Sequence, residues 1–130
     1  DLHRRRHSFP TRRSSDLVMS ENTALKYLQQ QGMICLAKRF KTPYGEIDLL
    51  MQDEQTIVAV EVKYRKSLTQ AAYSIRLKQQ LRIQQALEFW ISQHKDYSIK
   101  PPFQRFDVVL VCPPEIISYY KNAWTPEISY

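Results

Sequence analysis

The most apolar stretch of the chain, TIVAVEVKY over residues 56–64, carries two charged side chains, Glu61 and Lys63. If this stretch is a β-strand, its period of two places both side chains on one face of the sheet. One interpretation is a surface ion pair, which contributes under about 1 kcal/mol to stability. The other is part of a catalytic site. A nearby carboxylate favours the second interpretation.

Asp48 supplies that carboxylate, because it lies in the preceding alternating segment EIDLLMQ, residues 46–52. The polar residues 53–55 indicate a hairpin, which brings Asp48 toward Glu61. Two carboxylates in a partly dry site repel each other, and Mg²⁺ (or Mn²⁺) relieves that repulsion through oxygen ligands. Lys63 can then balance the remaining charge or hold a water. These three residues, the trio, predict a catalytic site for phosphodiester hydrolysis in which Asp48 and Glu61 bind the metal.

The first half of the chain is expected to position this site through one helix and three strands. Ser20 is expected to cap a helix that ends at Gly32, and residues 33–40 to form a strand. Gly45 is expected to close the next turn with a positive φ. In the segment 46–52, alternation places Ile47, Leu49 and Met51 on one face, and Glu46, Asp48 and Leu50 on the other.

The second half is expected to add a helix over residues 68–94, on an apolar stripe with helical spacing: Ile83, Ala86, Leu87, Trp90 and Ile91. Strands are expected at 105–112 and 116–122. The order helix, three strands, helix, strand predicts an α/β fold with a mixed central sheet flanked by helices.

Three segments give the chain a specific resemblance: GEIDLL (45–50), EVKYR (61–65) and RFDVVLV (105–111). They are similar to the signature blocks of the YraN family of bacterial proteins, and ENTALKYLQQQG and LKQQLRIQQAL are similar to its two helices. The resemblance implies the PD-(D/E)XK nuclease fold, with a restriction-endonuclease-like αβββαβ core. It also implies that Glu21 completes the metal site of Asp48 and Glu61, and that Lys63 is the catalytic lysine.

Basic residues beyond the trio are candidates for nucleic-acid binding. Lys78 and Arg82 lie four residues apart on one helix face, where they either hold phosphates or form a solvated surface. With Arg65, they are our predicted phosphate contacts. Asp107 is expected to pair with Arg105 or another strand neighbour rather than to bind metal. Core or surface packing is favoured over base stacking for the aromatic residues Tyr119, Tyr120 and Trp124.

Residues 1–17 are expected to lie outside the fold, and residues 18–130 to form a single domain. The segment HSFPTRRSSDL, residues 7–17, is similar to the conceptual translation of a sequencing-library adapter. Without residues 1–17, the net charge of +6 falls to +3, which permits nucleic-acid binding without requiring it.

The composition of the chain excludes several kinds of site and segment. Two glycines exclude a glycine-rich phosphate loop, and no apolar run is long enough to cross a membrane. Cys35 and Cys112 lack zinc-ligand spacing and are expected to be buried thiols of a cytoplasmic protein. The sequence therefore predicts a Mg²⁺-dependent endonuclease-like protein acting on DNA. The alternative is a nucleic-acid-binding module that keeps the fold and does not cleave.

Overall fold

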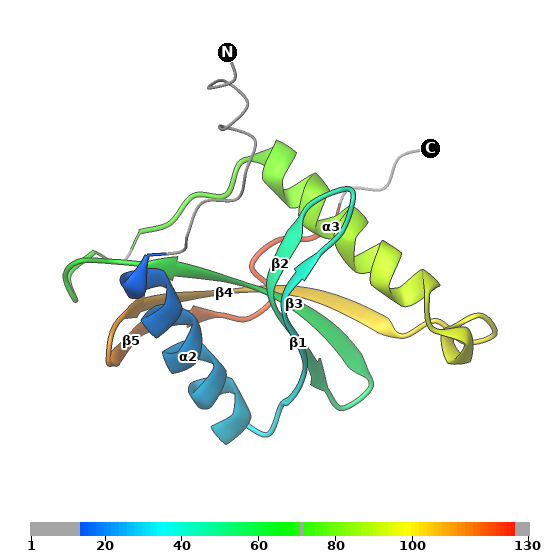
Figure 1. The fold of residues 1–130 in the computed structure, drawn as a ribbon, viewed down its shortest axis with the longest axis horizontal. Helices are drawn as coiled ribbons and strands as arrows, with labels where there is room; N and C mark the ends of the chain where they lie inside the picture. The colour runs from blue at the N-terminus through cyan, green and yellow to red at the C-terminus, as the bar shows by residue number, and fades with distance from the viewer. Residues whose placement is uncertain (1–13, 71, 127–130) are drawn as a thin grey trace, which may run out of the picture.

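The computed structural model describes residues 14–70 and 72–126 (Figure 1). In this part of the chain, one five-stranded sheet has the order β1-β2-β3-β4-β5; β3 and β4 run parallel and the other neighbours antiparallel. The α-helices and β-strands are α2 (Ser15–Gln30), β1 (Ile34–Lys41), β2 (Glu46–Asp53), β3 (Thr56–Tyr64), α3 (Leu77–Ser92), β4 (Phe103–Cys112) and β5 (Glu115–Tyr120), and a short 3-10 helix, η2 (Lys95–Tyr97), follows α3. The predicted α/β architecture is confirmed and is consistent with a restriction-endonuclease-like fold. Within the described ranges, no helix has the length and apolar character needed to cross a membrane.

The two helices cover opposite faces of the sheet, so β3 contributes to two hydrophobic cores. Val58, Val60 and Val62 pack with Ala24 and Leu28 of α2. Their alternate neighbours Ile57 and Ala59 pack with α3, whose buried side chains are Ile83, Ala86, Leu87 and Trp90. Strand β3 is therefore covered on both faces, and its alternation places Glu61 and Lys63 on the α3 side.

Helix α2 begins earlier than predicted. Ser14 is its N-cap, and the Ser14 Oγ accepts a hydrogen bond of 3.2 Å from the Leu17 N–H. Ser20, predicted as the cap, is instead buried inside the helix and donates to the Asp16 carbonyl at 2.7 Å. That prediction was wrong because a serine can also bond back to the carbonyl four residues earlier. The cap and first turn thus use residues 14–17, whereas residues 1–13 lie outside the described residues.

The end of α2 was predicted correctly. Gly32 has a positive φ of 94°. The N–H groups of Gly32 and Met33 donate to the carbonyls of Gln29 and Leu28 at 3.0 and 3.1 Å. These two bonds form a Schellman motif, which requires a left-handed residue that glycine adopts without strain.

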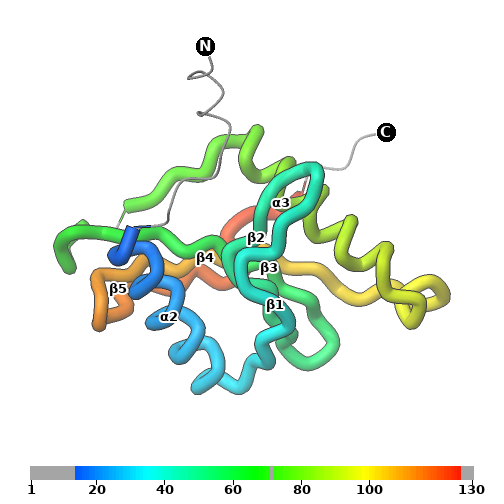
Figure 2. Tube along the Cα trace, in the orientation of Figure 1, coloured from blue at the N-terminus to red at the C-terminus, as the bar shows by residue number. Residues whose placement is uncertain are grey.

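The connection from β3 to α3 differs from the prediction, because the helix begins at Leu77 rather than near residue 68. Figure 2 shows this segment, described for residues 65–70 and 72–76, running along the sheet before it enters α3. The Gln70 side chain accepts from the N–H groups of Lys66 and Ser67 at 2.8 and 3.2 Å. Such side-chain bonds offer the backbone an alternative to a helix.

Gly45 is needed for a reason other than the predicted one. Among the described glycines, Gly32 has a positive φ and Gly45 does not. Instead, a Cβ atom at Gly45 would lie 3.2 Å from the Arg82 Cβ. Glycine therefore lets the β1–β2 turn approach α3 closely, which sequence periodicity does not show.

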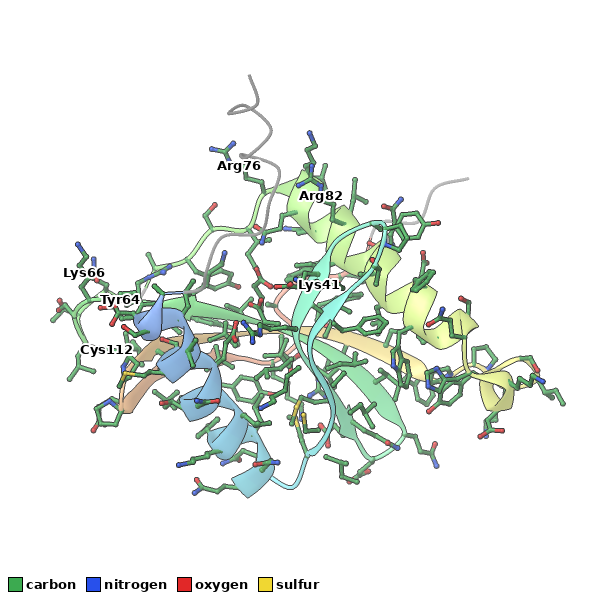
Figure 3. The ribbon with its side chains drawn as sticks, viewed as in Figure 1. Lys41, Tyr64, Lys66, Arg76, Arg82 and Cys112 are labelled. Carbon is green, nitrogen blue, oxygen red and sulfur yellow. The ribbon has the colours of Figure 1, made fainter. Side chains whose placement is uncertain are left out.

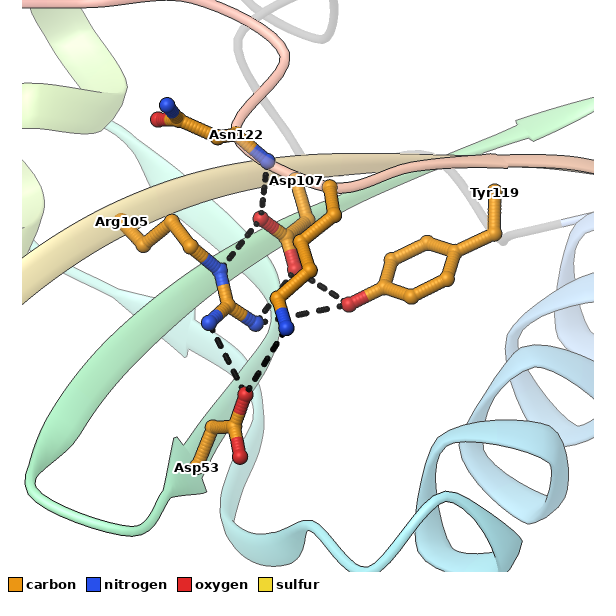
Figure 4. Close-up of polar contacts among 6 residues, drawn as sticks. Asp53, Arg105, Asp107, Tyr119 and Asn122 are labelled. Atoms are coloured by element: carbon orange, nitrogen blue, oxygen red, sulfur yellow. Dashed lines mark hydrogen bonds and ion pairs between the residues drawn. The ribbon is translucent and has the colours of Figure 1, made fainter.

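At the start of β4, Arg105 and Asp107 form a polar network that ties several strands together (Figure 4). Arg105 Nε and Nη2 donate to the two Asp107 carboxylate oxygens at 2.9 and 3.0 Å, and Nη1 donates to Asp53 Oδ2 at 2.9 Å. The Tyr119 hydroxyl and the Asn122 N–H also donate to Asp107, which is fully buried. The predicted pairing of Asp107 with Arg105 is confirmed.

The aromatic side chains after β4 pack against neighbouring rings, as predicted. Tyr120 contacts Tyr73 at 4.6 Å between ring centroids, and Trp124 stacks on Phe106 at 5.1 Å. These contacts cover the β4–β5 region on the α3 side.

Replacing Arg105 with Met should destabilise the domain by roughly 3 kcal/mol, because the buried Asp107 carboxylate then loses its charged partner. Urea denaturation measures this difference. Lys121→Met is the control: Lys121 is 60 % exposed and lies 3.8 Å from Asp53, so its loss should change stability by at most about 0.5 kcal/mol. Equally small losses of stability in the Arg105→Met and Lys121→Met variants would show that the network does not stabilise β4.

Candidate active site

Strands β2 and β3 separate at Asp48, and this separation creates the candidate site. Their backbone register runs from Asp53 opposite Thr56 to Leu49 opposite Val60. Beyond that point, Asp48 Oδ2 accepts a hydrogen bond of 2.8 Å from the Val62 N–H. A side-chain carboxylate thus takes the place of a backbone carbonyl, and Asp48 lies beside β3 as the hairpin predicts.

The alternation of β2 breaks next to Asp48. Leu49 and Met51 pack on the α2 side, and Leu50 packs on the α3 side. Ile47 joins Leu50 in the α3-side core, although strict alternation predicts it with Leu49 and Met51. The expected two-face assignment of β2 is therefore wrong at Ile47, which lies beyond the last residue of β2 in register with β3.

The neighbouring strand is also irregular at this level. Arg39 lies between Lys38 and Phe40, whose register partners Leu49 and Ile47 flank Asp48. Arg39 has a positive φ of 48°, which is uncommon for a residue other than glycine. The backbone of β1 is therefore unusual at the level of Asp48.

Glu61 is buried beside Asp48, with an exposed fraction of 8 %. Burial, then the charge of Asp48 and a hydrogen bond with it, raise the pKa of Glu61 to about 8 from an ordinary value of 4.5. Lys63 opposes this shift, since its Nζ lies 3.7 Å from Glu61 Oε2. The structure thus brings the predicted trio together, and the burial of Glu61 excludes a simple surface pair.

A fourth side chain, Gln79, was missed by the sequence analysis. Its Nε2 donates to Glu61 Oε2 at 2.6 Å from the first turn of α3. Gln79 lies four residues before Ile83 and seven before Ala86, so it continues the buried stripe of the helix. A polar residue on an apolar stripe was the signal that could have identified it.

Glu21 is buried on α2, with an exposed fraction of 8 %. Within residues 14–70 and 72–126, no three or more His, Cys, Asp or Glu side chains form a group suited to a metal ion. The structure therefore brings Asp48 and Glu61 together but does not bring Glu21 into a three-residue group with them. The role of Glu21 as a ligand stays a prediction.

The predicted phosphate contacts differ in their surroundings. Arg65 donates through Nε and Nη2 to the Ala72 carbonyl and through Nη1 to the Tyr64 carbonyl, so its guanidinium holds the connection to α3. Lys78 and Arg82 are exposed on α3. Figure 3 shows Arg76 and Arg82 projecting from the same end of this helix. Lys78 and Arg82 are therefore open to solvent, whereas the Arg65 guanidinium is bonded within the chain, and the phosphate contacts stay a prediction.

The two carboxylates suit a hard divalent cation. Mg²⁺ prefers oxygen ligands and is commonly held by one or two carboxylates, with water completing its coordination. A cation also offsets the repulsion that contributes to the raised pKa of Glu61. Asp48 and Glu61 are thus the residues that would hold Mg²⁺.

Fold and site together define a mixed-sheet α/β protein with a carboxylate pair and a lysine where two strands separate. The profile of Uncharacterised protein family UPF0102 matches residues 20–111. A UPF0102 protein of Nitrobacter winogradskyi is 43% identical over 108 residues, which cover 82% of this chain and 89% of that protein. One of Bradyrhizobium diazoefficiens is 40% identical over 97 residues, covering 74% and 71%. The chain belongs to the UPF0102 family, which is the YraN family, so the resemblance is confirmed.

Stability should depend on the protonation of Glu61. Because its folded pKa of about 8 exceeds the ordinary 4.5, the folded state binds this proton more tightly than the unfolded chain. The stabilising contribution is complete below pH 4.5, falls as the pH rises toward 8 and is lost above it. In urea titrations with EDTA, wild type should lose stability relative to Glu61→Gln across this range.

Glu88→Gln is the control, since Glu88 is exposed on α3. It should retain the pH dependence of the wild type. Parallel curves for wild type and Glu61→Gln would show that Glu61 does not titrate in this window.

Proposed function

We propose that the protein is a Mg²⁺-dependent endonuclease-like protein that hydrolyses phosphodiester bonds in DNA. One observation carries this proposal: Asp48 and Glu61 lie together beside Lys63, whose Nζ is 3.7 Å from Glu61 Oε2. Replacing buried charges with apolar side chains is often neutral or stabilising, so folding alone does not favour this arrangement. A buried carboxylate with a raised pKa and a charged partner supports a role in chemistry.

Each residue of the site has a role in this proposal. Mg²⁺ held by Asp48 and Glu61 would supply Lewis-acid stabilisation of the phosphoryl oxygens and an activated water. Lys63 would donate hydrogen bonds to the charge that develops on phosphate, where a fixed cation is most effective. Lys78 and Arg82 would hold the backbone of the nucleic acid from α3.

A second candidate is a nucleic-acid-binding module that does not cleave. It is supported by the exposure of Lys78 and Arg82, which serve binding with or without chemistry. The fold alone does not decide between the two functions. Labelled single-stranded, duplex and branched DNA, each incubated with Mg²⁺, Mn²⁺ or EDTA, separates them. Metal-dependent cleavage supports the nuclease, and binding without cleavage supports the module.

The cysteines favour the cytoplasm as the location in this proposal. Cys35 and Cys112 are free thiols. Both are half-buried, so the prediction that they are buried was wrong. Free thiols persist in a reducing compartment.

Mn²⁺ should stabilise the folded protein, because a ligand that binds only the native state shifts the unfolding equilibrium. At a concentration 100 times its Kd, the gain is about 2.7 kcal/mol. Thermal melts of wild type should therefore move upward with Mn²⁺, and Asp48→Asn should show a smaller shift. Identical shifts in the two proteins would remove Asp48 from the metal ligands.

Lys63→Met should lower the DNA cleavage rate by roughly 100-fold or more while DNA affinity changes little, because its charge acts mainly in the transition state. Lys78→Ala should weaken DNA binding and lower its salt slope by about 1. Gel-based cleavage assays and fluorescence anisotropy at several salt concentrations measure both effects.

Lys26→Ala is the matched control for these variants, since Lys26 is exposed on α2. This variant should change neither the DNA cleavage rate nor the DNA affinity. Full cleavage by Lys63→Met would contradict the catalytic role, and loss of folding in this variant would make Lys63 a structural partner of Glu61.

A further inference from the structure

An amide and an ammonium group lie close to one oxygen of the candidate site. Gln79 Nε2 donates to Glu61 Oε2 at 2.6 Å, and Lys63 Nζ lies 3.7 Å from the same atom. The lysine comes from the same strand as Glu61, whereas the glutamine comes from α3, which packs across that face of the sheet. The Glu61 carboxylate is therefore held from two elements.

The amide of Gln79 differs from the lysine in what it can contribute. It carries no charge, so it cannot neutralise the carboxylate pair, but its N–H donor has a fixed direction. The helix beneath it is well anchored, because Gln79 continues the stripe of Ile83 and Ala86, both buried against the sheet. A donor on a fixed helix restricts the rotation of the Glu61 carboxylate.

We propose that Gln79 is a positioning residue of this site: it fixes the orientation of the Glu61 carboxylate toward Asp48 and a bound divalent cation. This inference rests on the proposed metal-dependent function. Groups that hydrogen-bond a metal ligand orient it, and their loss typically lowers metal affinity about 10- to 100-fold. Because Lys78 precedes Gln79, one turn of α3 would both contact phosphate and orient Glu61.

The test is Mn²⁺ binding by isothermal titration calorimetry, with thermal melts in EDTA as the measure of folding. Gln79→Leu removes the donor, and Gln79→Met removes it while keeping an unbranched side chain. Gln85→Leu is the matched control, since Gln85 is an exposed glutamine of the same helix. We expect both Gln79 variants to bind Mn²⁺ roughly 10-fold or more weakly, with melting temperatures in EDTA near that of wild type. The control should match wild type in Mn²⁺ affinity and in melting temperature.

Each other outcome has a distinct meaning. If wild type binds Mn²⁺ and the folded Gln79 variants bind it equally well, the positioning role is overturned and the proposed function stands. If wild type does not bind Mn²⁺, the metal-dependent function fails and this inference fails with it. If both Gln79 variants unfold in EDTA, Gln79 is a structural residue and the inference is overturned.

Discussion

The hydrogen bond from the Val62 N–H to Asp48 is the interaction on which the candidate site depends. At 2.8 Å, it replaces the backbone bond that β2 would otherwise make with β3. A buried backbone N–H without an acceptor is costly, so the strands can separate here only because a side chain supplies one. The same bond fixes Asp48 beside Glu61, and the repulsion between the two carboxylates follows from that position.

The sheet contains two buried acids in contrasting surroundings. Asp107 accepts from Nε and Nη2 of the Arg105 guanidinium, from the Tyr119 hydroxyl and from the Asn122 N–H. Glu61 has an amide and a more distant ammonium on one oxygen, and a second carboxylate as its neighbour. A buried acid whose negative charge is fully balanced by a cation and hydrogen-bond donors typically stabilises a fold. A buried acid whose charge is only partly balanced typically binds a cation or a proton.

Sequence alone predicted those parts of the site that depend on local periodicity and strand order. Period two placed Glu61 and Lys63 on one face, and a short hairpin placed Asp48 beside them. Gln79 could not be assigned in the same way, because its contact depends on how α3 packs across the sheet. The sequence predicted a helix from residue 68, whereas α3 begins at Leu77, because side-chain bonds such as those of Gln70 have no periodic signal.

The three blocks of the family resemblance differ in what they contribute to the molecule. In GEIDLL, Gly45 permits the close approach of α3, and Asp48 contributes its carboxylate to the site. The apolar residues of this block pack in the two cores. In EVK, Glu61 and Lys63 face α3, and the valine between them packs toward α2. In RFDVVLV, the charged pair forms the polar network and leaves no acid for the site. Two blocks therefore carry the candidate chemistry, whereas the third secures the strand that runs parallel to β3, against which Glu61 and Lys63 are held.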